Sequence, residues 1–189
     1  MAKIISLNQT DLELIKLCLD NNRQAQKAMY DKYAPKMLSV CRRYIKDLQY
    51  AEDVMVIAFF KIFKRLNQFE NKGSFEGWIK RIMVNEAISY LRSQKDYYIN
   101  EVTDTDNSEE AVAEMNLDME QWQNLIDELP KGCQMVFNLY VFEEYKHQEI
   151  AEQLQISIST SKTQLAHARK ILQQKIMHLE NFKYEQAIQ

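Results

Sequence analysis

Apolar residues recur at intervals of three and four along almost the whole sequence, which is the spacing of one face of an α-helix. The chain of 189 residues contains only three glycines and two prolines, fewer than a sheet-rich fold with many tight turns needs. No apolar run approaches the ~18 residues of a membrane-spanning helix. Residues 1–15 also lack the basic and apolar segments of a secretory signal. The sequence therefore predicts an all-α protein that is not inserted in a membrane.

The net charge of −3 conceals an uneven distribution of charge along the chain. Residues 1–95 hold 17 Lys or Arg and 10 Asp or Glu, whereas residues 96–130 hold 11 acidic residues and no basic one. Residues 131–189 are nearly neutral, with seven basic and six acidic residues. A segment of like charge without an apolar stripe repels itself and stays extended. We therefore expect two small helical domains, at residues 9–95 and 119–182, joined by a flexible acidic linker at residues 96–118.

The sequence shows no recognisable catalytic or metal-binding motif. The sequence contains no HExxH motif, no glycine-rich phosphate loop, and no serine or cysteine nucleophile beside a plausible histidine. The cysteines form no CxxC pair, and the histidines have no metal-ligand spacing with them. These residues are Cys18, Cys41, Cys133, His147, His167 and His178. We expect reduced thiols, a cytoplasmic location, no metal, no cofactor and no enzyme activity.

The N-terminal part of the chain shows successive helical stripes. Thr10 and Glu13 have the spacing of a capping box before a first helix. A second helix follows around Ala25 to Tyr33. Pro35 is expected in the first turn of the next helix, or at a kink before it, because proline lacks the backbone N–H of a helix interior.

Residues 51–66 are apolar nearly all round. Met55, Phe59, Ile62 and Leu66 form one face, while Val56, Ile57 and Phe60 lie on roughly the opposite face, beside Asp53. Such a helix must be covered on both sides. One side faces the core of its own domain, and we expect the other to face a partner. The alternative is a central helix that is fully buried in its own domain.

A loop at residues 70–78 holds two of the three glycines, and a helix from Phe75 to Lys95 follows it. Helical spacing places Arg81, Asn85 and Arg92 together on one face of that helix. Aromatic side chains stack on unpaired bases and cations track the backbone, so Phe75 and Trp78 beside these residues suggest a platform for single-stranded nucleic acid. The alternative is that both aromatics are core residues.

The stretch from Tyr145 to Ile176 has the pattern of two helices joined by a tight turn. Apolar stripes mark both helices, with Ile150, Ala151 and Leu154 on the first and Leu165, Ala168 and Leu172 on the second. Ser157 or Ser159 can cap the second helix. Gln155 stands in the turn, where a left-handed conformation costs a non-glycine residue roughly 1–2 kcal/mol. This pattern is typical of a helix-turn-helix, whose second helix can enter the major groove of DNA.

The other faces of the second helix carry side chains suited to DNA, since Lys and Arg bind phosphate and Gln can bind adenine through two hydrogen bonds. We expect Lys162, Thr163, Gln164, Ala166, His167, Arg169 and Lys170 to be available there. The alternative is an ordinary pair of antiparallel helices with a solvated polar face.

Three stretches, in this order, resemble bacterial sigma factors. AEDVMVIAFFKIFK resembles the AED-led helix of that family, and GSFEGWIKRIMVNEAISYLR resembles the stretch that follows it. LPKGCQMVFNLYVFEEYKHQEIAEQLQIS with TSKTQLAHARKIL resembles the C-terminal domain. The resemblance covers nearly all of residues 9–178 and is to the short, two-domain extracytoplasmic-function (ECF) group. It departs from the family at Val56-Ile57, where many members have Gln-Glu, at Gln155 in place of a turn glycine, and at Ser161 in place of an apolar residue.

The resemblance implies a factor that binds core RNA polymerase, through the β′ coiled coil and the β subunit, and directs it to promoter DNA. It assigns polymerase binding to Asp53, Val56, Ile57 and Phe60. It assigns −10 recognition to Lys72, Phe75, Arg81, Asn85 and Arg92, and −35 recognition to Lys162, Thr163, Gln164, His167 and Arg169. The family often has an anti-sigma factor, so one is a candidate partner here.

Two other functions fit parts of the sequence. A stand-alone helix-turn-helix regulator would use only the C-terminal domain and usually dimerise on a palindrome. A helical adaptor that binds no DNA is the third. The acidic segment also suggests a hypothesis of its own, namely that its carboxylates compete with DNA for the basic face of the first domain. The alternative for this segment is a tether only.

Overall fold

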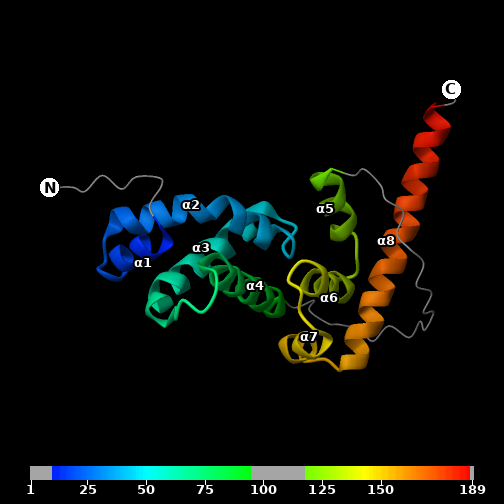
Figure 1. Ribbon diagram of the computed structural model, residues 1–189. Coiled ribbons are helices and arrows are strands. Elements are labelled where there is room, and N and C mark those ends of the chain that lie inside the picture. The colour runs from blue at the N-terminus through cyan, green and yellow to red at the C-terminus, as the bar shows by residue number, and fades with distance from the viewer. Residues whose placement is uncertain (1–9, 95–117, 188–189) are drawn as a thin grey trace. The chain divides into compact units, whose positions relative to one another are not determined.

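The computed structural model describes residues 10–94 and 118–187, with side chains described up to residue 179. Every regular element within these ranges is a helix, which confirms the all-α prediction (Figure 1). The chain separates into two compact units, Met1–Lys95 and Asp96–Gln189. The predicted acidic linker falls outside the described residues except for Asp118, whose carboxylate accepts from the Gln121 N–H at 2.8 Å and caps a helix.

In its described residues, the first unit consists of four α-helices and one short 3₁₀ helix. Their bounds are α1 Asp11–Leu19, α2 Arg23–Arg42, α3 Leu48–Arg65, η1 Leu66–Gln68 and α4 Phe75–Ser93. Side-chain oxygens accept hydrogen bonds from the first turns of α2, α3 and α4, and these caps are Asn22, Asp47 and Ser74. Each cap satisfies an N–H group that has no partner within its helix.

The core of the first unit lies among α2, α3 and α4. Its largest fully buried side chains come from all three helices and from η1, namely Met29, Met37, Ile62, Leu66, Ile79, Met83 and Ile88. α2 differs from the prediction because it runs without a break through Pro35. Pro35 is exposed, so water can bond to the carbonyl group that its missing N–H leaves unpaired. Tyr33 and Met37 on the buried face hold the helix together across that position.

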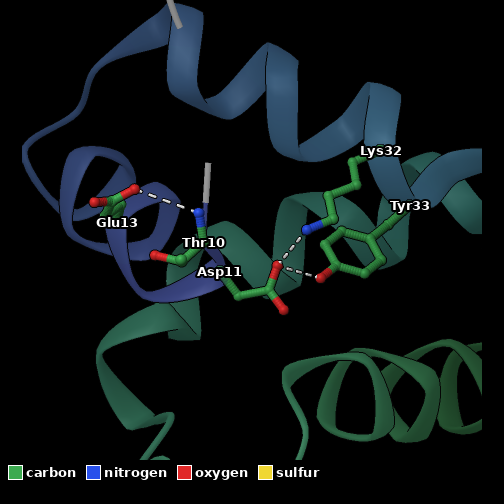
Figure 2. A network of polar contacts seen from close by, with 5 residues as sticks. All are labelled: Thr10, Asp11, Glu13, Lys32 and Tyr33. Carbon is green, nitrogen blue, oxygen red and sulfur yellow. Dashed lines mark hydrogen bonds and ion pairs between the residues drawn. The ribbon is translucent and has the colours of Figure 1, made fainter. Parts of the chain in front are cut away.

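A polar network joins α1 to α2 (Figure 2). The Asp11 carboxylate accepts from Lys32 Nζ at 2.7 Å and from the Tyr33 hydroxyl at 2.5 Å. Burial alone would raise the pKa of Asp11, but the hydrogen bonds from Lys32 and Tyr33 outweigh it and hold the pKa below its ordinary value. Beside the network, the Thr10 N–H donates to the Glu13 carboxylate at 3.3 Å.

The second unit consists of α5 Met119–Asp127, α6 Lys131–Val141, α7 His147–Leu154 and α8 Ile158–Ala187. α6 and α7 pack against α8, and an ion pair between Lys175 and Glu128 joins α8 to the end of α5. The core includes Ile126, Met135, Leu139, Ile150 and Ile176. α8 continues to Ala187, past the expected domain end at residue 182, and extends beyond the other helices of its unit (Figure 1).

Candidate functional site

α3 has two apolar faces, as the sequence predicts. Met55 and Phe59 are buried in the core of the first unit, with 4% and 2% of their surface exposed. Val56, Ile57 and Phe60 are 54%, 48% and 59% exposed on the other face. The alternative of a helix buried on all sides is therefore wrong. We call these three residues the α3 apolar patch.

Charged and aromatic groups border the α3 apolar patch. Lys64 Nζ lies 4.3 Å from the centre of the Phe60 ring, a cation–π contact. Asp53 is exposed on the same face one turn earlier. Tyr50 continues this face toward the start of α3; it is 53% exposed, and its ring centre lies 5.9 Å from that of Tyr90 in α4. Sequence reasoning missed Tyr50, although its spacing of three from Asp53 and seven from Ile57 places it on this face.

A cavity of about 410 Å³ lies beside the start of α4, between η1 and the loop before α4. Its lining residues combine aromatic, cationic, polar and glycine positions: Gln68, Phe69, Glu70, Lys72, Gly73, Ser74, Gly77, Trp78 and Arg81. Gly73 has a φ of 157° and Asn71 a φ of 56°, so the loop turns through conformations that most side chains disfavour. The cavity therefore owes its shape to the glycine-containing loop that the sequence indicates.

Phe75 does not reach this cavity, and its assignment to direct DNA contact is wrong. It is 3% exposed and packs against Tyr33, Phe69 and Trp78, with ring centres 5.6, 5.2 and 5.8 Å away. Large aromatics favour burial, and the first position of α4 faces inward here. Phe69 and half-buried Trp78 line the cavity instead, so Phe75 supports the wall from behind. Phe69 is a residue that the sequence analysis did not single out.

An exposed basic stripe runs along α4 from the cavity. Arg81 lines the cavity, and Asn85 and Arg92 follow at helical spacing, all three exposed. Lys72 at the cavity edge forms an exposed ion pair with Glu70 at 2.5 Å. Exposed pairs of this kind contribute little to stability, so Lys72 can exchange Glu70 for a phosphate at small cost.

The helix-turn-helix of the second unit has the predicted geometry. Gln155 adopts the left-handed conformation, with φ 56° and ψ 45°, and the Ile156 N–H donates to the Ala151 carbonyl at 3.0 Å. Ser157 rather than Ser159 caps α8, because its hydroxyl accepts from the Thr160 N–H at 2.9 Å. Ala151 is 7% exposed where α7 meets α8.

Gln164 is not available on the outer face of α8, contrary to the sequence prediction. It is 2% exposed, and its Oε1 accepts a hydrogen bond from the Cys133 thiol of α6 at 2.9 Å. Its position, three residues after buried Ser161 and four before buried Ala168, places it on the inner stripe of the helix. Gln164 cannot contact a base without leaving the core.

The other predicted −35 residues differ in their surroundings. Lys162 is exposed, and Thr163 and His167 are half-exposed. Arg169 is exposed at the side of α8, where its guanidinium lies 5.7 Å from the centre of the Tyr140 ring. Ser159, Ala166 and Lys170 lie on the same outer face as Thr163, because they are at helical spacing from it.

His147, at the start of α7, contacts both helices that flank it. Its ring stacks on Tyr140 with centres 4.9 Å apart, and its Nδ1 lies 2.9 Å from the Ser161 hydroxyl. Burial, with the nearby charges of Lys162 and Arg169, lowers the pKa of His147 below its ordinary value. Ser161, where many family members have an apolar residue, is thus a hydrogen-bonding partner in the interface between α7 and α8.

In the described residues, an all-helical fold with a helix-turn-helix in one unit, and a basic stripe beside an aromatic cavity in the other, is typical of a DNA-binding protein of the helix-turn-helix class. The family model for Sigma-70 region 2 matches residues 29–97, and that for Sigma-70, region 4 matches residues 119–172. Together they cover more than half of the chain, which belongs to the sigma-70 family, in its ECF group. Sigma factors bind RNA polymerase and direct it to promoters, and this is the function of the chain.

Curated relatives match the chain over most of its length. The ECF RNA polymerase sigma factor SigW of Bacillus subtilis is 27% identical, over 87% of this chain and 96% of the relative. The ECF RNA polymerase sigma-E factor of Escherichia coli K12 is 25% identical, over 90% of this chain and 96% of the relative. Both relatives therefore align across the two units.

Two solved structures share the fold. CnrH, in complex with the cytosolic domain of CnrY, superimposes with a TM-score of 0.51 and 17% identity, covering 89% of this chain and 97% of CnrH. The sigma factor RpoE from Bartonella quintana, in complex with the anti-sigma factor NepR, gives the same TM-score and identity over 80% of this chain and 96% of RpoE. In the part of this chain that is described, no helix is long and apolar enough to cross a membrane.

Proposed function

We propose that the two units divide the work of this sigma factor among three surfaces. The α3 apolar patch with Asp53 binds the β′ coiled coil of core RNA polymerase. The cavity and basic stripe of the first unit take the −10 element, and the outer face of α8 takes the −35 element. The observation that carries this proposal is the exposure of Val56, Ile57 and Phe60, because a stand-alone helix-turn-helix regulator has no use for such a patch.

Polymerase binding through the patch has a direct physical basis. Covering exposed apolar surface contributes about 25 cal/mol per Å² before the costs of association. Many family members carry Gln-Glu at the positions of Val56 and Ile57, so this chain makes a more apolar contact than they do. The second unit contacts the β subunit in the same assembly, as the family resemblance implies.

The cavity suits one unstacked base of the −10 element. Extruding a base costs a few kcal/mol, and stacking on an aromatic side chain returns about 1–3 kcal/mol per base. Phe69 and Trp78 supply the aromatic wall, while Lys72 and Arg81, which also line the cavity, bind the flanking phosphates. Asn85 and Arg92 continue the contact along α4. Phe75 acts only by supporting the wall.

Binding rather than chemistry is the role of this chain, since RNA synthesis belongs to the polymerase. The chain works where the polymerase is, in the cytoplasm. An exposed apolar patch on a free protein is a site where another protein can bind. We therefore also propose an anti-sigma factor as a partner that covers the α3 apolar patch. The RpoE structure, solved with the anti-sigma factor NepR, offers a precedent in a protein of the same fold.

Co-purification of the full chain with core polymerase tests the first surface. Phe60→Asp places a charge in the patch, so we expect loss of at least tenfold in polymerase affinity with the helical circular dichroism retained. Leu12→Asp is the matched control, because Leu12 is 48% exposed on α1, a helix that carries none of the patch residues. Equal affinity for the parent and Phe60→Asp would refute the assignment.

Transcription from a randomised promoter library then tests the two DNA surfaces. The assembled polymerase should select two sequence elements that a core enzyme alone ignores. A chain that binds a palindrome as a dimer, and gains nothing from polymerase, would instead be a stand-alone regulator.

A further inference from the structure

Among the described side chains, the outer face of the first turns of α8 carries no group that can bind the adenine edge through two hydrogen bonds. Between residues 158 and 170, Gln164 is the only side chain with an amide, and it is buried on the inner face of α8. Asn and Gln are the side chains that bind the adenine edge through two hydrogen bonds. Arg169, a side chain that can bind guanine in this way, lies at the side of the helix over the Tyr140 ring. The usual means of reading adenine is therefore missing from this face.

Methyl groups occupy the centre of the same face. Thr163 and Ala166 are both half-exposed and three residues apart, so their side chains are neighbours on the helix surface. The Thr163 hydroxyl donates to the Ser159 carbonyl of its own helix at 3.1 Å, so its hydrogen is already used in a hydrogen bond. The groups that Thr163 and Ala166 present to a ligand are therefore mainly two methyl groups. Lys162 lies beside them with an exposed ammonium group.

Thymine is the base that such a surface fits. In the major groove it presents a C5-methyl group, which apolar contacts from Ala or a Thr methyl recognise. Small side chains at positions 163 and 166 also let the helix backbone come close to the groove floor. Lys162 supplies a phosphate or guanine contact next to the methyl pair.

We propose that α8 identifies A·T pairs in the −35 element by the thymine methyl group, through Thr163 and Ala166, and not by the adenine edge. This inference rests on the proposed −35 role of α8 and deepens it. It predicts that the −35 element contains at least one A·T pair whose identity depends on the thymine strand.

Replacing thymine by uracil removes only the methyl group, which makes a sharp test. The probe is the promoter duplex that the assembled polymerase selects from a randomised library, with single 2′-deoxyuridine replacements across its −35 element. At one or two positions we expect about fourfold weaker binding, the factor that follows from burying one carbon group. Replacing the paired adenine by 7-deazaadenine should leave affinity unchanged. Loss with 7-deazaadenine but not with uracil would overturn the inference.

Variants assign the effect to side chains. Thr163→Ser keeps the hydroxyl and removes the methyl group, and Ala166→Gly removes the other methyl group. At least one of them should bind the thymine and uracil duplexes equally. Met177→Ala is the control, because it trims an apolar side chain that is 54% exposed further along α8, and it should keep the fourfold preference. If both methyl-deleting variants keep that preference, the assignment is wrong.

The results of these experiments distinguish a failure of this inference from a failure of the proposed function. If the polymerase selects no −35 element, or one that hydroxyl-radical protection does not place against the second unit, the proposed role of α8 fails. If it selects such an element and no uracil replacement weakens binding, only the thymine inference fails.

Discussion

The amide of Gln164 is buried on the inner side of the helix that we propose for −35 binding. Its Oε1 accepts from the Cys133 thiol, and burial raises the pKa of that thiol to about 11. A buried polar pair of this kind is costly to break, because the remaining group stays in the core without its partner. Gln164 therefore holds α8 against α6.

Gln164→Ala should destabilise the second unit without changing base preference. We expect a loss of about 1–3 kcal/mol, the usual cost of leaving a buried polar group unsatisfied. Amide hydrogen exchange of α6 and α8 in the full chain measures it. Lys162→Ala is the contrasting variant, because an exposed phosphate contact should leave exchange unchanged and reduce the salt dependence of DNA binding by about one counterion. Altered base preference with unchanged exchange in Gln164→Ala would contradict this account.

At the scale of elements, the Asp11–Tyr33–Phe75 contacts join α1 to the wall of the cavity. Tyr33 donates to Asp11 and its ring makes a T-shaped contact with Phe75, which in turn supports Phe69 and Trp78. The cavity is thus built on three helices, although only η1, the loop and α4 line it. This arrangement predicts that the hydroxyl and the ring of Tyr33 have separable effects.

Tyr33→Phe removes the hydroxyl and keeps the ring, so it should loosen α1 and spare DNA binding. A hydrogen bond to a charged group contributes about 1.5–3 kcal/mol, and exchange of the α1 amides should report a loss of that order. Tyr33→Ala also removes the ring behind Phe75, and we expect weaker binding of the −10 single strand by the assembled polymerase. Equal DNA affinities for the two variants would show that Phe75 needs no support from Tyr33.

Sequence periodicity predicted the elements better than it predicted the directions of single side chains. The two faces of α3 and the left-handed turn at Gln155 follow from local rules, and both are confirmed. The local rules failed for Pro35 and Gln164, because the surroundings of each residue determine its structure. The exposed face of α2 tolerates a missing N–H, and a thiol on α6 satisfies an amide on α8. Contacts between elements distant in sequence cannot be read from spacing alone.

At the scale of the whole molecule, the charge pattern of the chain places an acidic segment between two DNA-binding units. Residues 96–130 hold 11 acidic residues and no basic one, and most of them lie outside the described residues. Anions repel DNA, although like charge also keeps a tether extended. The hypothesis from the sequence is that five of these carboxylates, at positions 104, 106, 109, 110 and 114, compete with DNA for the basic faces around Arg81, Arg92 and Lys95. A tethered competitor acts at high effective concentration even when each contact is weak.

Neutralising the acidic segment should tighten DNA binding by the free protein. The variant changes Asp104, Asp106, Glu109, Glu110 and Glu114 to Asn or Gln, and its affinity is measured for a promoter duplex and for the non-template single strand. The gain over the parent should shrink as salt rises, because charges at the surface are screened over about 10 Å at 0.1 M. Arg81→Gln supplies the control: with part of the basic stripe removed, the same neutralisation should gain less. If parent and variant bind DNA with identical affinities at low salt, the carboxylates do not compete with DNA. The segment is then only a tether.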